Sequence, residues 1–150
     1  MKTYILAFFA VTMLALGCTK DQFVEDREDI EAYLDENSID AEYDEEGYYF
    51  KIENAGTGND HPNIASNVEV RYKGYLLDGS VFDQTENGET LVFPLAGLVP
   101  GWQLAIPKLK RGGSGTFYFP SALGYGRASR PGIPANSPLI FEIDLVDFEN

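Results

Sequence analysis

The sequence contains very little of the chemistry on which most active sites depend. Its 150 residues include one cysteine (Cys18), one histidine (His61) and one tryptophan (Trp102). A Ser-His-Asp or Cys-His triad needs partner residues that this sequence lacks, and a zinc site needs several nitrogen or sulfur ligands. With a single cysteine, an internal disulfide is excluded as well. We therefore expect neither a metal nor a cofactor.

Basic residues are also scarce. The chain has 24 Asp and Glu against 11 Lys and Arg, which gives a formal charge of −13. Thirteen of the acidic residues lie in residues 19–46 beside only two basic ones, so the rest of the chain is close to balanced. A phosphate backbone is bound by a basic stripe, which is missing here, so nucleic acid is not expected as a partner.

The first residues have the pattern of an export signal. Lys2 precedes an apolar run over residues 4–16 that is too short to span a bilayer. The run ends in Leu14-Ala15-Leu16-Gly17-Cys18, which resembles the bacterial lipobox, whose cysteine is acylated. The resemblance implies a lipoprotein signal peptide over residues 1–17 and an anchor at Cys18. It also implies a place in the bacterial cell envelope, at the outer membrane on its periplasmic side or at the cell surface. The alternative is a plain signal peptide with an incidental cysteine.

Residues 18–46 are predicted to form an acidic tether that carries one helix. Phe23, Ile30, Tyr33 and Leu34 recur at roughly helical spacing, and charged residues fill the remaining positions. The thin apolar stripe favours a solvated spacer that lifts a domain off a membrane. A dimerisation or docking helix is the alternative.

A β pattern begins at residue 47. Residues 68–76 alternate between apolar and charged positions, and Asp78-Gly79 is a strong hairpin signal. Further strands are predicted over residues 48–52, 91–95, 116–119 and 139–148.

One short helix interrupts the strands. Trp102, Ala105, Ile106 and Leu109 recur at i, i+3, i+4 and i+7, and Pro107 is expected to shorten the last turn. Together, these strands and this helix predict an α+β domain over residues 47–150, with an antiparallel β-sheet wrapped around one short α-helix.

Aromatic residues are the candidates for a site. They lie on or beside elements whose apolar faces should converge, namely Tyr72, Phe82, Phe93, Trp102, Tyr125 and Phe141. A plain hydrophobic core would also explain such rings. Two features indicate a ligand site instead. Tyr72 needs a polar partner, for which Asp83 is the candidate, and Tyr125 lies between two glycines in a loop. Such a set can bind an apolar, amide-bearing ligand but has no group suited to a proton relay.

Five ordered motifs then carry a family resemblance. They are Val70-Arg71-Tyr72-Lys73-Gly74, Asp78-Gly79-Ser80-Val81-Phe82-Asp83, Val99-Pro100-Gly101-Trp102, Leu123-Gly124-Tyr125-Gly126 and Leu139-Ile140-Phe141-Glu142-Ile143. Over residues 47–149 the chain resembles the FKBP-type peptidyl-prolyl cis-trans isomerases. The resemblance implies a prolyl pocket with Tyr72, Phe82, Asp83, Trp102, Tyr125 and Phe141 as catalytic residues, and Phe93, Val99 and Ile133 as substrate-binding residues. Trp102 would form the floor, while the Val99 amide and the Tyr125 hydroxyl would bind substrate carbonyls.

The resemblance also sets expectations for partners. Proline-containing peptides and unfolded envelope proteins would be substrates, macrolides would inhibit, and the chain would be a monomer. Two alternatives come from other classes. A non-catalytic proline-peptide binding module or holdase could use the same fold. An adhesion or assembly subunit could work through the acidic helix, and deletion of residues 19–46 would then abolish function.

Overall fold

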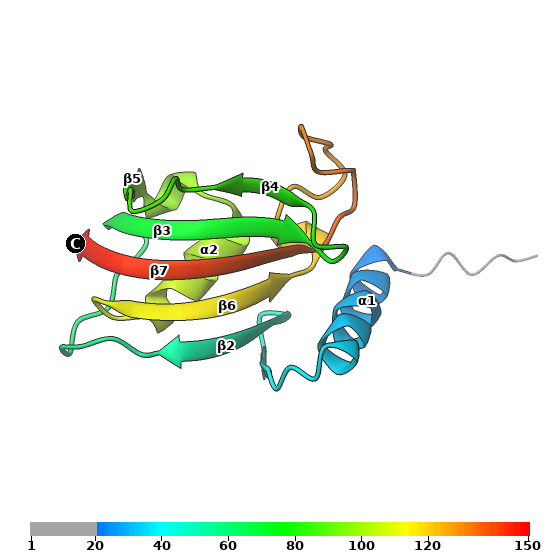
Figure 1. Ribbon diagram of the computed structural model, residues 1–150, viewed down its shortest axis with the longest axis horizontal. Coiled ribbons are helices and arrows are strands. Elements are labelled where there is room, and N and C mark those ends of the chain that lie inside the picture. Colours follow the sequence, from blue (N-terminus) through cyan, green and yellow to red (C-terminus); the bar gives the residue numbers. More distant parts are fainter. Residues whose placement is uncertain (1–20) are drawn as a thin grey trace, which may run out of the picture.

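The structure is a computed structural model that describes residues 21–150, so the predicted signal peptide and Cys18 lie outside the described residues. In the described part, the chain forms one antiparallel sheet in the order β1-β2-β6-β7-β3-β4, with β5 also paired to β3 (Figure 1). Its strands are β1 (Glu42–Asp44), β2 (Tyr48–Asn54), β3 (Asn67–Leu76), β4 (Val81–Gln84), β5 (Leu91–Pro94), β6 (Gly113–Phe119) and β7 (Leu139–Glu149). The helices are α1 (Gln22–Glu36) and α2 (Pro100–Ala105), with short 3-10 segments η1 (Leu95–Gly97), η2 (Ile106–Lys108) and η3 (Ser121–Leu123).

The two longest strands, β3 and β7, form the centre of the sheet. They pair from Asn67 opposite Glu149 to Leu76 opposite Leu139. Along its other edge, β3 pairs first with β5 and then with β4. The turn into β4 contains Gly79 at φ 86°, a left-handed conformation that glycine adopts without strain. The predicted antiparallel sheet and its Asp78-Gly79 hairpin are confirmed.

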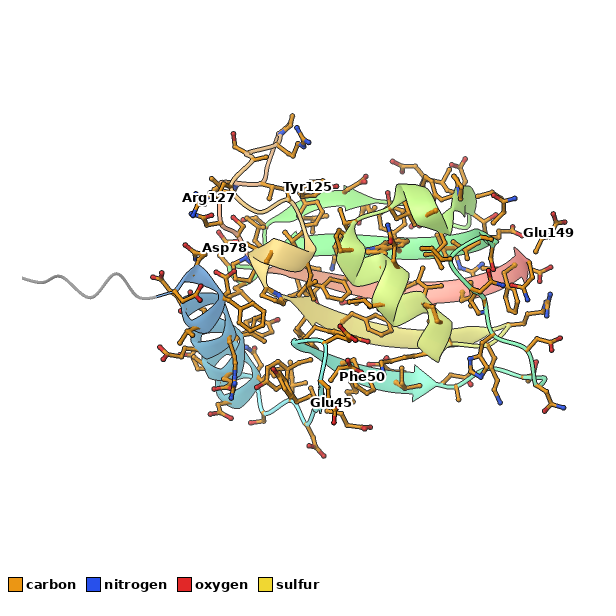
Figure 2. The ribbon with its side chains drawn as sticks, turned by 180° about the vertical axis from the view of Figure 1, so that it is seen from behind. Glu45, Phe50, Asp78, Tyr125, Arg127 and Glu149 are labelled. Atoms are coloured by element: carbon orange, nitrogen blue, oxygen red, sulfur yellow. The ribbon has the colours of Figure 1, made fainter. Side chains whose placement is uncertain are left out.

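Helix α2 packs on one face of this sheet and closes the main core (Figure 2). Trp102, Ala105 and Ile106 are all buried against side chains of β3, β6 and β7. The α-helix ends at Ala105 and continues as the 3-10 segment η2, which contains Pro107. The predicted shortening by Pro107 is therefore confirmed, since its nitrogen cannot donate to the helical ladder.

Helix α1 packs against the opposite face of the sheet and is not solvated all round. Ile30 and Leu34 are 1% and 6% exposed, and they form a second apolar cluster with Tyr118 and Ile140. This corrects the expected solvated tether. The physical reason is that β6 and β7 carry apolar side chains on both faces of the sheet. Without α1, those on the outer face would be exposed to water, so the packing of α1 is favourable.

The sheet also begins earlier than residue 47. Strand β1 pairs with β2 around a turn at Gly47, whose φ is 93°. A β-carbon at Gly47 would lie 2.5 Å from the Phe23 ring of α1, so only glycine allows this close approach. The segment assigned to the tether thus contributes an edge strand and a packed helix. None of the helices in residues 21–150 is long and apolar enough to cross a membrane.

Candidate active site

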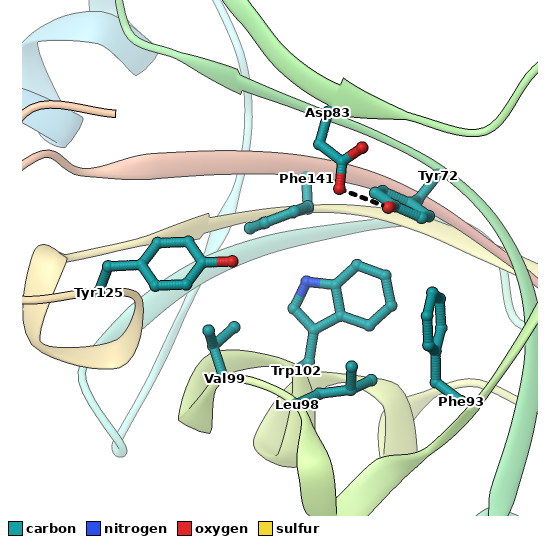
Figure 3. A pocket seen from close by; sticks show the side chains of 8 residues that line it. All are labelled: Tyr72, Asp83, Phe93, Leu98, Val99, Trp102, Tyr125 and Phe141. Atoms are coloured by element: carbon teal, nitrogen blue, oxygen red, sulfur yellow. Dashed lines mark hydrogen bonds between the residues drawn. The ribbon is translucent and has the colours of Figure 1, made fainter. Parts of the chain in front are cut away.

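A cavity of about 150 Å³ opens between α2 and the sheet. Eight residues line it (Figure 3), namely Tyr72, Asp83, Phe93, Leu98, Val99, Trp102, Tyr125 and Phe141. They come from β3, β4, β5, the segment that leads into α2, α2 itself, the loop after η3, and β7. Seven of them were predicted from the sequence, so the structure brings most of the expected set together.

Trp102 lies in the first turn of α2, with its ring in the cavity (Figure 3). Pro100 begins the helix, and the Trp102 amide donates to the Val99 carbonyl at 3.0 Å. Proline is favoured at a first helical position because its missing donor is not needed there. A β-carbon at Gly101 would lie 2.7 Å from the Phe119 ring. Glycine at this position therefore lets the backbone of α2 approach the sheet closely.

The aromatic rings of the wall meet edge to face. The Trp102 ring centroid lies 5.2 Å from that of Tyr72 at 85° and 5.3 Å from that of Phe141 at 89°. Edge-to-face pairs are favoured because the positive edge of one ring meets the negative face of the other. The packing therefore holds these rings in a fixed arrangement before any ligand enters.

The polar groups of the cavity are few. The Tyr72 hydroxyl donates to Asp83 Oδ2 at 2.6 Å, which confirms Asp83 as the partner expected for Tyr72. Burial and, next, the hydrogen bond to Asp83 raise the pKa of the Tyr72 hydroxyl above its ordinary value. A phenol with a raised pKa does not act as a base at neutral pH. Within residues 21–150, no group of three or more His, Cys, Asp or Glu side chains could hold a metal ion.

Tyr125 faces the cavity from the loop that follows η3, as its position between two glycines suggested. Its hydroxyl points into the cavity and makes no hydrogen bond to the other seven residues drawn in Figure 3. The Arg130 guanidinium lies 5.6 Å from the centroid of the Tyr125 ring, a cation–π distance. The hydroxyl is thus presented to any ligand in the cavity.

Two predicted site residues are not among the eight that line the cavity. Phe82 packs edge to face on Phe141 at 5.5 Å, and a β-carbon at Gly74 would lie 2.6 Å from its ring. Ile133 is 5% exposed and belongs to the main core, where it borders a separate hollow beside Leu76. The structure therefore gives Phe82 and Ile133 supporting positions.

One lining residue, Leu98, was missed. Leu98 is neither an aromatic residue nor part of the five motifs that carry the family resemblance. Its signal is its place as an apolar residue directly before Val99 and the start of α2 at Pro100.

The sequence comparison decides the family. The model of the family described as FKBP-type peptidyl-prolyl cis-trans isomerase matches residues 58–146. The chain belongs to this family. Every residue that lines the cavity falls within the matched range, whereas α1, β1 and β2 precede it. The observed fold, an antiparallel sheet with one short helix across its face, agrees with this membership.

Bacterial relatives share the same domain. The FKBP-type peptidyl-prolyl cis-trans isomerase FkpA of Escherichia coli K12 is 41% identical over 102 residues, which cover 67% of this chain and 37% of the relative. The peptidyl-prolyl cis-trans isomerase Mip of Coxiella burnetii is 37% identical over 102 residues, which cover 67% of this chain and 44% of the relative. The chain thus spans less than half the length of these relatives.

Solved structures agree with the fold. The crystal structure of FkpA from Escherichia coli superposes with a TM-score of 0.72 at 35% identity, and the match covers 85% of this chain and 63% of the FkpA chain in that crystal structure. A peptidyl-prolyl cis-trans isomerase from Pseudomonas syringae gives a TM-score of 0.72 at 26% identity, over 88% of this chain and 99% of that one.

Proposed function

We propose that this chain is a peptidyl-prolyl cis-trans isomerase that accelerates rotation about Xaa–Pro bonds. The cavity carries the proposal. It is lined mostly by apolar rings, its one carboxylate accepts a hydrogen bond from Tyr72, and the Tyr125 hydroxyl faces its interior. Membership of the FKBP-type family supports the same reaction.

The size of the cavity fits a proline ring. An apolar cavity of roughly 150 Å³ can hold benzene, and the pyrrolidine ring of proline is no larger. The volume here is about 150 Å³. The apolar carbons of proline would contact Trp102 and Phe141, and the mouth of the cavity would leave the flanking peptide outside.

The chemistry of rotation suits a site without a base. Rotation about a peptide bond faces a barrier of about 18–20 kcal/mol because amide resonance is lost as the bond twists. In the twisted state the carbonyl is less polar than in the planar ground state. An apolar pocket therefore favours the twisted amide over the planar one, and this difference in binding lowers the barrier.

The polar groups would hold the peptide backbone. We assign the Tyr125 hydroxyl and the Val99 amide as donors to substrate carbonyls, with Trp102 as the floor beneath the proline. Asp83 would keep the Tyr72 ring in place through their 2.6 Å hydrogen bond. Phe82 and Ile133 would support this lining through their packing contacts.

The test is the cis-to-trans relaxation of a Leu-Pro test peptide with the full chain. We expect acceleration over the uncatalysed rate and its loss when a macrolide inhibitor is added. A Tyr125→Phe variant keeps the ring and removes the hydroxyl, so it should fold normally and turn over more slowly. A folded wild-type chain that binds the peptide without acceleration would contradict the proposal and favour a binding module or holdase.

We also propose that the chain is a lipid-anchored envelope protein that acts on unfolded envelope proteins as a monomer. The export pattern and lipobox-like motif over residues 1–18 support the anchor. Residues 18 and 21 can lie at most roughly 11 Å apart, so an anchor at Cys18 would hold α1 close to the membrane. Labelled palmitate should enter the chain in a bacterial host and should not enter a Cys18→Ser variant.

A further inference from the structure

A buried carboxylate connects α1 to the loop that carries Tyr125. Asp26 is 1% exposed, and its Oδ2 accepts hydrogen bonds from the Ser121 amide at 2.7 Å and from Ser121 Oγ at 2.5 Å. Its Oδ1 accepts a hydrogen bond from Gln22 Nε2 at 2.7 Å. Three donors thus satisfy the carboxylate, and two of them belong to one residue that lies 95 positions along the chain.

Ser121 in turn organises the segment around Tyr125. Ser121 begins the 3-10 segment η3 and is itself 2% exposed. Its carbonyl accepts hydrogen bonds from the amides of Gly124 at 2.9 Å and Gly126 at 2.8 Å. These two glycines flank Tyr125 directly. Figure 2 shows α1 beside the part of the chain that carries Tyr125.

Loss of the Asp26–Ser121 hydrogen bonds should destabilise this part of the chain. Hydrogen bonds to a charged acceptor are shorter and stronger than neutral ones. Removal of the carboxylate would leave the Ser121 amide and hydroxyl buried without an acceptor, and a buried unsatisfied donor is costly. The Ser121 segment would then move so that these donors can bind water, and the turn that it holds around Tyr125 would move with it.

We propose that Asp26 is a positioning residue of the isomerase site, which acts through Ser121 to hold Tyr125 over the cavity. The proposal deepens the proposed function and rests on it. It assigns α1, which precedes the residues matched by the family, a part in the site. Asp26 does not touch the cavity, and its effect on the reaction passes through the Ser121 carbonyl and the Tyr125 turn.

The first measurement is amide hydrogen exchange on the full chain, for which activity is not needed. In an Asp26→Ala variant we expect exchange at Gly124 and Gly126 to quicken by about tenfold or more, as local opening becomes easier. Amides in the centre of β7 should keep their wild-type rates. Asp29→Asn is the matched control, since it removes one carboxylate from an exposed position on the same helix. Unchanged exchange at both glycines in Asp26→Ala would overturn the proposal.

The second measurement is kcat/KM in a double-mutant cycle with Tyr125→Phe. Asp26→Ala should lower kcat/KM by about tenfold, within the hundredfold that a 1 Å misplacement can cost. In the Tyr125→Phe background, Asp26→Ala should lower kcat/KM much less, because the hydroxyl that it would misplace is already absent. A loss of the same size in both backgrounds would show that Asp26 acts elsewhere and would overturn the proposal.

Two further outcomes remain decisive. If Asp26→Ala does not fold, Ser121→Ala replaces it, since this variant loses only the hydroxyl donor and should change exchange and kcat/KM in the same direction by less. If the wild-type chain shows no isomerase activity, the proposed function fails. The exchange rates at Gly124 and Gly126 then still support or overturn the connection from Asp26 to the Tyr125 turn.

Discussion

The Tyr72 hydroxyl and the Asp83 carboxylate meet at 2.6 Å across the hairpin that joins β3 to β4. The Tyr72 ring also packs edge to face on Trp102 at 5.2 Å. Asp83 therefore influences the floor of the cavity through Tyr72, even though Asp83 itself lies at an exposed position of β4. Asp83 could either orient Tyr72 or contact the substrate, and this geometry favours orientation.

The pair should behave as one unit in mutant kinetics. We expect Tyr72→Phe and Asp83→Ala each to lower kcat/KM by about tenfold, with the double variant close to the worse single one. Each variant should keep its free energy of unfolding within about 1–2 kcal/mol of the wild type, because one hydrogen bond is lost. The measurements are peptide isomerisation and urea unfolding of all four chains. Losses that multiply would assign Asp83 a direct contact with substrate.

Gly74 controls how closely two rings approach β3. A β-carbon at this position would lie 2.6 Å from the Phe82 ring and 2.8 Å from the Phe141 ring. We expect Gly74→Ala to destabilise the chain by about 1–3 kcal/mol, as overpacking does, and to lower kcat/KM because Phe141 lines the cavity. Gly97→Ala is the control, since its β-carbon would meet only Pro94 at 3.7 Å, an ordinary contact. Equal stability of the two variants in urea unfolding would contradict this account.

The packing of α1 predicts a large effect of a single apolar side chain. Ile30 is 1% exposed, whereas Val24 on the same helix is 44% exposed. Ile30→Ala should lower the free energy of unfolding by about 2–5 kcal/mol. Val24→Ala should keep it within about 0.5 kcal/mol of the wild type. Urea unfolding of the full chains provides both values. If both variants match the wild type, α1 contributes nothing to stability.

Deletion of residues 19–46 is consequently a poor test of an assembly role for the acidic helix. The deletion would expose Tyr118 and Ile140 of the sheet, which pack against Ile30 and Leu34 of α1. Loss of function after deletion could then come from exposure of this apolar surface. Substitutions at exposed acidic positions of α1 test such a role without this damage.

Local patterns in the sequence were enough for most of the sheet and for α2. Alternation identified β3, and Pro107 fixed where α2 gives way to a 3-10 turn, because both signals act within a few residues. The docking of α1 is different, since it depends on the outer face of distant strands. Phe117-Tyr118-Phe119 and Leu139-Ile140-Phe141 are unbroken apolar runs, and such runs indicate strands buried on both faces.

The site was predictable to the extent that the family motifs covered it. Phe82 was expected in the lining but packs edge to face on Phe141 outside it, because a short motif does not specify which of two neighbouring rings faces the ligand. The contact of Asp26 with Ser121 could not be predicted from the sequence. Its partner Ser121 is 95 residues away, and an aspartate in an acidic helix resembles its solvated neighbours until the helix is placed.

The interface of α1 should also be sensitive to alkaline pH through Tyr118. Burial first, and then the nearby Tyr33, Glu53 and Glu142, raise the pKa of Tyr118 to about 12. The unfolded chain has a tyrosine pKa of about 10. The folded state therefore keeps a proton that the unfolded state releases. This contribution to stability is fully present below pH 10 and is lost as the pH rises toward 12.

Between pH 9 and pH 11, the free energy of unfolding of the wild type should fall by about 1 kcal/mol more than that of Tyr118→Phe. Urea unfolding followed by circular dichroism measures both slopes. Identical slopes would mean that Tyr118 ionises in the folded chain as easily as in the unfolded one, and that α1 does not shield it.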